Sequence, residues 1–353
     1  MPVIHGNVEI YMGPQGAGGP DDLKKVIIEF IKGAKKKLEV AVQELDNEDI
    51  ARAIVDARLR GVQVQLVLEL DYLREDKPLT DPWTPSGSLE PNRVIQSAIY
   101  RAAIRVNSDF NADIFHQKFI IRDGNALLTG STNFTDTGVE KNLNHVVIVK
   151  DKKVASTYSK EFAEIRQGHF GKLNEGHDEA PRDVTVSDIP VRILFAPDHN
   201  PEMEIMKQMA KARKRVDFAI FTFAESSGID DQMILLTKQA GIPVTGALDG
   251  RQANQKWAAT RPVKNAGATL YRVSSSATVG KLHHKLMVID EQVIIGGSFN
   301  YTRPANKLND ENIFILGDLE SPAGPSKNAQ KKLARFVLTE INRIIEDHGV
   351  KIN

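Results

Sequence analysis

Two stretches of the chain carry the same set of chemically active side chains at the same spacing. The first runs from His116 to Asn133 and the second from His283 to Asn300, and both follow the pattern His-x-Lys-x4-Asp-x6-Gly-Ser-x-Asn. Imidazole groups act as nucleophiles and general acid–base catalysts, whereas lysine and asparagine supply positive charge and hydrogen-bond donors. Because a phosphodiester gathers negative charge on its oxygens in the transition state, this combination suits phosphoryl-transfer chemistry.

Each copy has the form of a strand, a tight turn and a returning strand. Side chains alternate along a strand, so His116 and Lys118 are expected to point to the same side, as are His283 and Lys285. The Asp-Gly pair at Asp123 suits a turn, and the return strand then ends in Gly-Ser-x-Asn. One copy of such a short pattern would be weak evidence, but two copies with identical internal spacing indicate a duplicated site.

The elements that must position these side chains are repeated as well. Each half is expected to contain a short apolar strand, an amphipathic helix leading into a buried strand, a second such helix and strand, and a closing helix with a polar face. The corresponding segments are 8–14 and 191–197, 22–42 and 202–221, 50–70 and 230–250, and 153–168 and 327–349.

The alternation of strands and helices predicts an α/β fold, made twice as two tandem α/β/α sandwich lobes, each around a largely parallel sheet. A chain of 353 residues is long enough for two lobes. The segment 170–190 is polar, rich in proline and glycine and without periodicity, which is typical of a linker. We therefore expect the first lobe at 1–169, the linker at 170–190 and the second lobe at 191–353.

Composition narrows the class of protein. Lys plus Arg and Asp plus Glu both number 46, so no overall field attracts a polyanion, and such a contact must come from local patches. The chain has no cysteine, which excludes disulfides, thiolate metal ligands and a thiol nucleophile. Neither a secretory leader nor a transmembrane segment is recognisable, so a cytoplasmic location is expected.

The duplicated pattern resembles the signature of the phospholipase D superfamily, and the resemblance covers almost the whole chain. It implies two halves related by pseudo-twofold symmetry, with one active site at their interface. It also implies that one imidazole attacks phosphorus to form a phosphohistidine, while the other protonates the leaving oxygen and then activates water or an alcohol. Because lysines supply the positive charge, neither a metal nor a cofactor is expected. The implied catalytic residues are His116, Lys118, Asn133, His283, Lys285, Asn300 and Glu311, with Asp123, Ser131, Asn144, Asp290 and Ser298 in supporting positions.

The two halves differ at one position that follows the motif, where the first half has Asn144 and the second has Glu311. In members of the superfamily this position often carries an acid or an amide that orients the motif histidine. We expect Asn144 to lie beside His116 and Glu311 beside His283, where a carboxylate would raise the pKa of the imidazole. On this interpretation His283 is the general acid and His116 is the nucleophile.

The other histidines are expected to be structural. His284 and His145 each follow a candidate site residue on an apolar strand, and a packed position explains them better than catalysis. The histidines at positions 5, 169, 177, 199 and 348 fall in loops or at ends, and we expect them at the surface.

The motif does not select the substrate, so the segments that frame the site have to do so. The segment 249–273 interleaves Arg251 and Lys256 with Trp257, and a proline-rich excursion contains Trp83. Cations beside aromatic rings suit a nucleic-acid backbone with stacked bases, and these four residues are therefore predicted to bind substrate. This reasoning favours a metal-independent nuclease with nucleic acid as substrate. An unidentified partner protein of a defence or repair system is also possible on this interpretation.

The alternative is a phospholipase D or phosphatidyltransferase acting on phospholipids. Against it, the sequence offers neither an interfacial amphipathic helix nor an anchoring segment. A non-catalytic scaffold is less favoured, because every motif position is intact in both halves.

Overall fold

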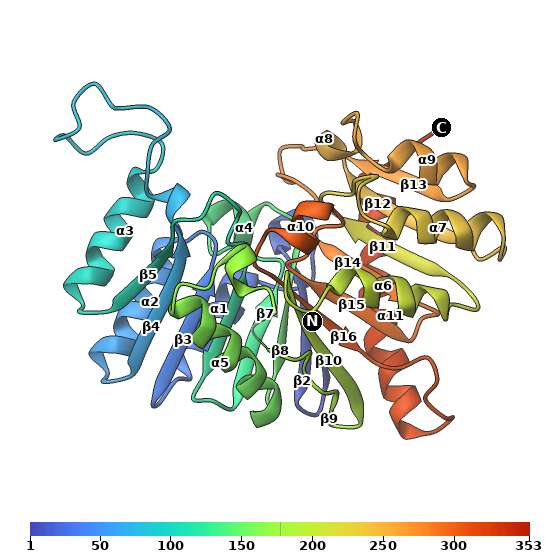
Figure 1. The fold of residues 1–353 in the computed structure, drawn as a ribbon, viewed down its shortest axis with the longest axis horizontal. Helices are drawn as coiled ribbons and strands as arrows, with labels where there is room; N and C mark the ends of the chain where they lie inside the picture. The colour runs from blue at the N-terminus through green and yellow to red at the C-terminus, as the bar shows by residue number, and fades with distance from the viewer. Residues whose placement is uncertain (177) are drawn as a thin grey trace.

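The structure is a computed structural model that describes residues 1–176 and 178–353, and it contains two mixed β-sheets lying side by side (Figure 1). The first half of the chain builds an eight-stranded sheet in the order β1-β2-β8-β7-β6-β3-β4-β5. The second half builds a nine-stranded sheet in the order β17-β13-β12-β11-β14-β15-β16-β10-β9. The strands of the first sheet are Val3–His5 (β1), Val8–Gly13 (β2), Lys37–Val42 (β3), Gln63–Glu69 (β4), Arg105–Asp109 (β5), Lys118–Arg122 (β6), Ala126–Gly130 (β7) and Asn144–Val149 (β8). Those of the second are Val184–Val186 (β9), Ile189–Ala196 (β10), Val216–Ile220 (β11), Val244–Asp249 (β12), Thr269–Val273 (β13), Lys285–Ile289 (β14), Val293–Gly297 (β15), Glu311–Leu316 (β16) and Gly349–Lys351 (β17).

Most neighbouring strands run antiparallel, so the expectation of largely parallel sheets is wrong. Among the strands of the described residues, parallel pairing is confined to β3–β4–β5 and to β11–β12–β13, apart from isolated bridges outside the strands. Parallel neighbours need a crossover connection, and helices supply one at these places. The two motif strands are instead joined by a tight turn, which makes β6–β7 and β14–β15 antiparallel.

Helices cover both faces of each sheet, which is the α/β/α layering expected from the sequence. Helices α1, α2 and α3 pack on one face of the first sheet in one apolar cluster, and α6, α7 and α9 do so on the second. Helices α5 and α11 lie between the sheets in a third cluster that takes strand residues from both halves. The α-helices are Leu23–Lys32 (α1), Glu48–Leu59 (α2), Glu90–Arg101 (α3), Asp136–Glu140 (α4), Lys152–Arg166 (α5), Pro201–Ala210 (α6), Ile229–Lys238 (α7), Gly250–Ala253 (α8), Thr260–Asn265 (α9), Arg303–Lys307 (α10) and Pro325–His348 (α11), with short 3₁₀ helices at Gln15–Ala17 (η1), Leu70–Tyr72 (η2) and Gly171–Asn174 (η3).

The motif aspartates hold the hairpins in place. Asp123 and Asp290 adopt left-handed backbone angles, with φ of 54° and 53°, at the turn of each hairpin. The Asp123 carboxylate accepts the backbone N–H groups of residues 35–37, and Asp290 accepts those of residues 213–215. These amides lead into β3 and β11, so each aspartate fixes its hairpin against the strand that pairs with it, at the opposite end of β6 or β14 from the motif histidine.

The segment expected to be a linker is only partly irregular. Strand β9 (Val184–Val186) falls within 170–190 and pairs with β10, which itself begins at Ile189. The hairpin escaped sequence analysis because β9 has only three residues and two residues with positive φ, Ser187 and Asp188, connect it to β10. The proposed lobe limits at 169 and 191 stay a prediction.

Candidate active site

The two motif histidines are brought together by backbone pairing across the two halves. Phe115 bridges Asp310, and Leu143 bridges Leu282, each as a parallel pair outside the named strands. The His116 N–H donates to the carbonyl of Asp310 at 3.0 Å, and the His283 N–H donates to that of Leu143 at 3.0 Å. Each histidine, which precedes β6 or β14 of its own half, therefore lies beside the segment that leads into β16 or β8 of the other half.

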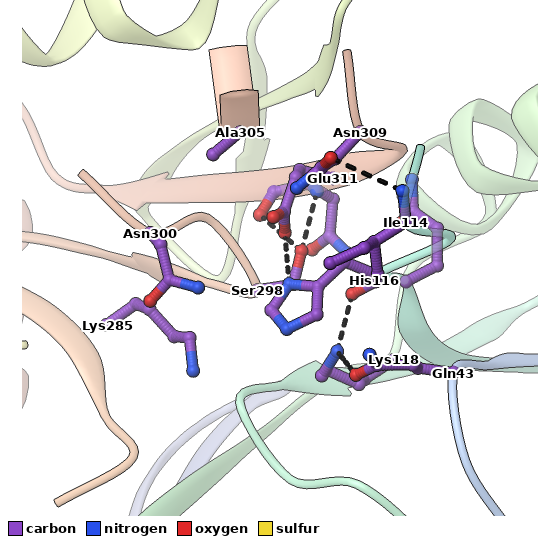
Figure 2. A network of polar contacts seen from close by, with 12 residues as sticks. Gln43, Ile114, His116, Lys118, Lys285, Ser298, Asn300, Ala305, Asn309 and Glu311 are labelled. Atoms are coloured by element: carbon purple, nitrogen blue, oxygen red, sulfur yellow. Dashed lines mark hydrogen bonds and ion pairs between the residues drawn. The ribbon is translucent and has the colours of Figure 1, made fainter. Parts of the chain in front are cut away.

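This crossing reverses the expected partners of the two imidazoles. His116 Nδ1 lies 2.7 Å from Glu311 Oε2, and His283 Nδ1 lies 2.9 Å from Asn144 Oδ1. The prediction that Glu311 stands beside His283 and Asn144 beside His116 is therefore wrong. Sequence reasoning paired each histidine with its own half, whereas the interface exchanges the partners. Figure 2 shows the contact between His116 and Glu311.

The hydrogen bonds of Asn144 fix the tautomer of His283. The Asn144 amide group donates from Nδ2 to the carbonyl of Gly138 at 2.8 Å, and its Oδ1 accepts from Ser131 Oγ at 2.8 Å. Because Oδ1 only accepts hydrogen bonds, His283 Nδ1 must carry the hydrogen. The Nε2 atom of His283 is then left for chemistry, in either protonation state.

The Gly-Ser pairs allow the partner strands to approach. A Cβ atom on Gly130 would lie 2.2 Å from the carbonyl oxygen of His145, and one on Gly297 would lie 2.3 Å from that of Asn312. Both glycines also have positive φ, which favours glycine. Ser131 and Ser298 then bond to the same neighbouring backbones, since each Oγ accepts the N–H of residue 145 or 312. Asn144 and Glu311 directly precede the bonded residues 145 and 312, so the Gly-Ser pairs hold both side chains at the interface.

The motif lysines are almost fully buried, and each is tied back to its own histidine. Lys118 Nζ donates to the carbonyl of His116 at 2.7 Å and to Gln43 Oε1 at 3.1 Å. Lys285 Nζ donates to the carbonyl of His283 at 2.9 Å. Figure 2 shows the Lys285 and Asn300 side chains reaching toward the same space as His116 and Lys118. Ammonium groups held in this way are preorganised for an anionic ligand.

The motif asparagines lie at the edge of the same space and are held by residues that follow β3 and β11. Asn133 Nδ2 donates to Gln43 Oε1 at 3.2 Å. Asn300 Oδ1 accepts the backbone N–H of Thr222 at 3.2 Å, so this bond does not use the NH₂ group of Asn300, which can donate to a ligand. Both side chains are partly exposed, so a ligand can reach them.

Burial dominates the electrostatics of this site. It raises the pKa of Glu311 to about 8, against the opposing effect of Lys118. Burial, followed by the charges of Lys118 and Lys285, lowers the pKa of His116 well below its usual value. The pKa of His283 is lowered for the same reasons, with Lys285 as the strongest charge. Burial also lowers the pKa of Lys118 to about 7 and that of Lys285 well below its usual value, so an anionic phosphodiester would stabilise the charged forms of both lysines.

Sequence analysis missed five residues that build the site. Glu69 and Asp249 end β4 and β12, and each carboxylate accepts the backbone N–H of the residue before the motif histidine, at 2.7 and 3.3 Å. Gln43 and Phe221 directly follow β3 and β11 at equivalent positions, and the Phe221 ring lies 5.0 Å from that of His283. Lys281 also lowers the pKa of both motif histidines. Aligning the strand ends of the two halves would have found four of them.

Behind the catalytic residues lies a second pair of cross-interface contacts. Asn312 Nδ2 donates to Gln117 Oε1 at 2.6 Å, and at the equivalent positions His145 and His284 stack with ring centroids 5.5 Å apart. Both histidines are fully buried, and their Nδ1 atoms lie 3.2 Å apart. They belong to the packing of the interface.

The structure does not bring the four predicted substrate-binding residues into one place. Arg251 lines a pocket of about 420 Å³ together with Lys281, whereas Lys256 lines a separate pocket of about 680 Å³ with Glu225. Trp83 is 94% exposed and Trp257 is 44% exposed. The tryptophans occupy equivalent connections, after β4 and after β12, and Figure 1 shows both connections on the upper edge of the molecule.

Among the described residues, one group has the geometry for a metal ion, namely Asp178, Asp198 and His199. His199 Nδ1 accepts the N–H of Phe195, so Nε2 carries the hydrogen that it donates to Asp178 at 2.7 Å. These hydrogen bonds account for the group without a metal, and no motif residue belongs to it. His199 is partly buried and its side chain is only 2% exposed, which corrects the expectation of a surface position, and residue 177 lies outside the described residues.

The fold and site define a phospholipase D-like protein. The family model described as "Cardiolipin synthase, PLD-like domain" matches residues 27–166 and 205–332, one stretch in each half and well over half of the chain. The chain therefore belongs to this family. No helix among the described residues is both long enough and apolar enough to cross a bilayer.

Individual relatives are more distant. The chain is 28% identical over 133 residues to a mitochondrial cardiolipin hydrolase of Xenopus laevis, which covers 38% of this chain and 56% of the relative. It is 28% identical over 139 residues to a phospholipase D of Rickettsia bellii, covering 39% and 61%. The chain thus spans a little over half the length of these curated relatives. The fold is similar to that of phosphatidylserine synthase from Haemophilus influenzae Rd KW20, with a TM-score of 0.67, 14% identity and coverage of 100% of this chain and 89% of the other.

These comparisons overturn the expectation of a nuclease. The named relatives are a cardiolipin hydrolase and a phospholipase D, and the family model is that of a cardiolipin synthase domain. The argument for nucleic acid rested on cations interleaved with aromatic rings, at Arg251, Lys256 and Trp257 in one segment and at Trp83 in another, and Arg251 and Lys256 line different pockets. The phospholipid alternative is the better interpretation.

Proposed function

We propose that the protein is a phospholipid phosphodiesterase of the phospholipase D type, which transfers a phosphatidyl group to water or to an alcohol through a phosphohistidine. The observation that carries the proposal is the pair of buried imidazoles, each oriented through Nδ1 by a residue of the other half. Membership of the phospholipase D-like family and the phospholipid names of the relatives support the substrate class.

In the first step, His116 Nε2 attacks phosphorus and a nitrogen–phosphorus bond forms while the bond to the leaving oxygen breaks. His283, as the imidazolium, gives its Nε2 proton to that oxygen. In the second step, His283 takes a proton from water or an alcohol, whose oxygen attacks phosphorus and releases His116. Lys118, Lys285, Asn133 and Asn300 stabilise the negative charge on the phosphoryl oxygens in both steps.

His116 remains the proposed nucleophile, but for a different reason from the one drawn from the sequence. Burial raises the pKa of Glu311 to about 8, and the positive charge that the His116 ring acquires in the reaction favours the ionised carboxylate. In that form Glu311 accepts from His116 Nδ1–H and directs the Nε2 lone pair to substrate. The carboxylate also balances the positive charge that the ring acquires when Nε2 is phosphorylated. His283 has a neutral amide instead, so that it gives up its proton readily. A bound phosphodiester anion favours the imidazolium that this role needs.

The exposed tryptophans are proposed to contact the lipid surface. Trp83 and Trp257 are the two tryptophans of the chain. They lie in equivalent connections, after β4 and after β12, and Figure 1 shows both connections at the upper edge of the molecule. Tryptophan favours the interface between water and hydrocarbon, because its ring is large and carries one polar N–H group. The cytoplasmic location and the protein partner stay predictions.

The test is to incubate the protein in EDTA with vesicles of phosphatidylcholine, phosphatidylglycerol and cardiolipin, with and without a primary alcohol. Release of the head group, with phosphatidic acid or the phosphatidyl alcohol as the other product, is expected. The absence of turnover of all three lipids, in a preparation that hydrolyses bis(p-nitrophenyl) phosphate, would contradict the proposed substrate class.

A further inference from the structure

A polar pocket opens beside the second motif, outside the set of motif residues. It has a volume of about 420 Å³, and its lining includes Phe221, Arg251, Ser274, Ser275 and Lys281. Arg251 and Lys281 bring positive charge, and the two serines bring hydroxyl groups that both donate and accept hydrogen bonds. The pocket therefore combines the groups that bind a phosphate.

Lys281 connects this pocket to the catalytic centre. Its ammonium group and that of Lys285 each lie 5.3 Å from the centroid of the Phe221 ring, so the two charges are separated by at most twice that distance. The same ring lies 5.0 Å from His283, the proposed donor of the proton to the leaving group. The pocket thus lies on the leaving-group side of the proposed reaction.

The positive charges of the pocket are available to a ligand. Among the described residues, neither Lys281 nor Arg251 has a salt bridge. Asp249 is the acid in the pocket lining, and its carboxylate accepts the backbone N–H groups of Arg251, Gln252 and Leu282. The carboxylate is thus engaged by the chain's own amides and, among the described residues, forms no salt bridge with either cation, and its charge and that of Glu44 act on Lys281 only at longer range.

We infer that Arg251 and Lys281, with the hydroxyl groups of Ser274 and Ser275, form a second phosphate-binding subsite, so that the protein prefers substrates whose leaving group carries a phosphate of its own. Arginine binds phosphate through two parallel hydrogen bonds, and lysine adds a point charge. Because the ammonium groups of Lys281 and Lys285 both lie 5.3 Å from the centroid of the Phe221 ring, a ligand with two phosphates joined by a short spacer, such as three carbons, is a suitable probe of the subsite. The inference deepens the proposed function, since it names the class of phospholipid.

Binding of small phosphates tests the subsite without requiring lipid turnover. Isothermal titration calorimetry of the intact protein compares propane-1,3-diol bisphosphate with propyl phosphate, which lacks the second phosphate. The bisphosphate should bind at least tenfold more tightly. Arg251→Gln should remove most of this advantage, and Arg251→Lys should retain part of it. The matched control is Arg213→Gln, an exposed arginine at the opposite end of β11 from Phe221, which should leave the ratio unchanged.

Affinities within twofold of each other, which is the statistical factor for two phosphates, would overturn the inference, as would an advantage that survives both Arg251→Gln and Lys281→Gln. A second arm compares vesicles of cardiolipin, whose leaving group carries a phosphate, with vesicles of phosphatidylglycerol. Arg251→Gln should lower kcat/KM for cardiolipin at least tenfold more than for phosphatidylglycerol. If neither lipid is hydrolysed but the bisphosphate advantage stands, the proposed function fails and the subsite survives. If both are hydrolysed without the advantage, the reverse holds.

Discussion

The two half-sites have the same scaffold but different chemistry. In each, a hairpin presents a histidine and a lysine, a Gly-Ser pair admits a neighbouring strand, and a carboxylate at the end of β4 or β12 holds the backbone before the histidine. The first half-site adds Gln43 and receives Glu311, whereas the second adds Phe221 and receives Asn144. The comparison teaches that the motif sets the geometry, while residues outside it distinguish the roles of the two imidazoles.

The largest effect should come from removing either imidazole, because the half-sites form one centre. His116→Ala and His283→Ala are each expected to lower kcat for phospholipid hydrolysis by about 10³-fold or more. The measurement is the rate of head-group release from vesicles. A variant of either kind that kept a tenth of the activity, with an unchanged melting curve, would show that the half-sites work separately.

The next effect should separate the two orienting residues. Glu311→Gln should lower kcat on the order of 100-fold, because His116 loses its counter-charge, although the glutamine oxygen can still accept from Nδ1–H. Asn144→Asp should cost about tenfold, since a carboxylate raises the pKa of His283 and weakens it as an acid.

Both variants keep the shape of the side chain, and each serves as the control for the other. Equal losses would remove the distinction between the imidazoles, and a larger loss in Asn144→Asp would assign their roles the other way round.

A smaller effect should follow from making the half-sites more alike. Gln43→Phe copies the residue of the second half-site and removes the acceptor shared by Lys118 and Asn133. A loss in kcat of about tenfold is expected, because the two donors lose the group that positions them. The matched change Phe221→Gln should cost less, since the Phe221 ring makes no hydrogen bond. The expectation fails if Gln43→Phe retains full activity.

The free energy of unfolding should depend on pH through Glu311, which titrates, and not through Asn144, which does not. The pKa of Glu311 in the folded protein, about 8, lies above its ordinary value of 4.5. Between these two values the folded protein keeps a proton that the unfolded chain has released, so the free energy of unfolding falls as pH rises through this window. Glu311→Gln removes this titration, and its stability relative to wild type should increase from pH 5 to pH 8. Urea unfolding at several pH values measures it, and a pH-independent difference would contradict the burial of this carboxyl group.

The smallest effect is expected behind the catalytic centre. His145→Asn combined with His284→Gln copies the Asn312–Gln117 pair of the other half. Both histidines have a buried Nε2 without a hydrogen-bond partner, so the double variant should be more stable by about 1 kcal/mol, with activity within threefold of wild type. Thermal melting and vesicle hydrolysis test this. A large loss of activity would show that the stacked pair acts in the reaction.

Much of this molecule is predictable from its sequence because the two halves of the chain repeat the same pattern of strands, helices and motif residues. Comparing the halves indicated the two lobes, the strand and helix pattern, and the motif residues. It did not indicate that the chain exchanges Glu311 and Asn144 across the interface, because spacing along one half contains no information about contacts with the other. The largely antiparallel sheets were missed, although the tight turns at Asp123 and Asp290 already required one antiparallel pair of strands in each half. The substrate was misjudged because cations beside aromatic rings suit any phosphodiester, so the pattern around Arg251 and Trp257 did not separate nucleic acid from phospholipid.

Identification of the phosphorylated histidine tests the unequal roles of the two half-sites most directly. The protein is mixed with phospholipid vesicles, quenched within the first turnover under conditions that preserve phosphohistidine, digested and analysed by mass spectrometry. The account predicts the phosphatidyl group on the peptide that contains His116. A phosphatidyl group on His283, or equal amounts on both, would contradict it.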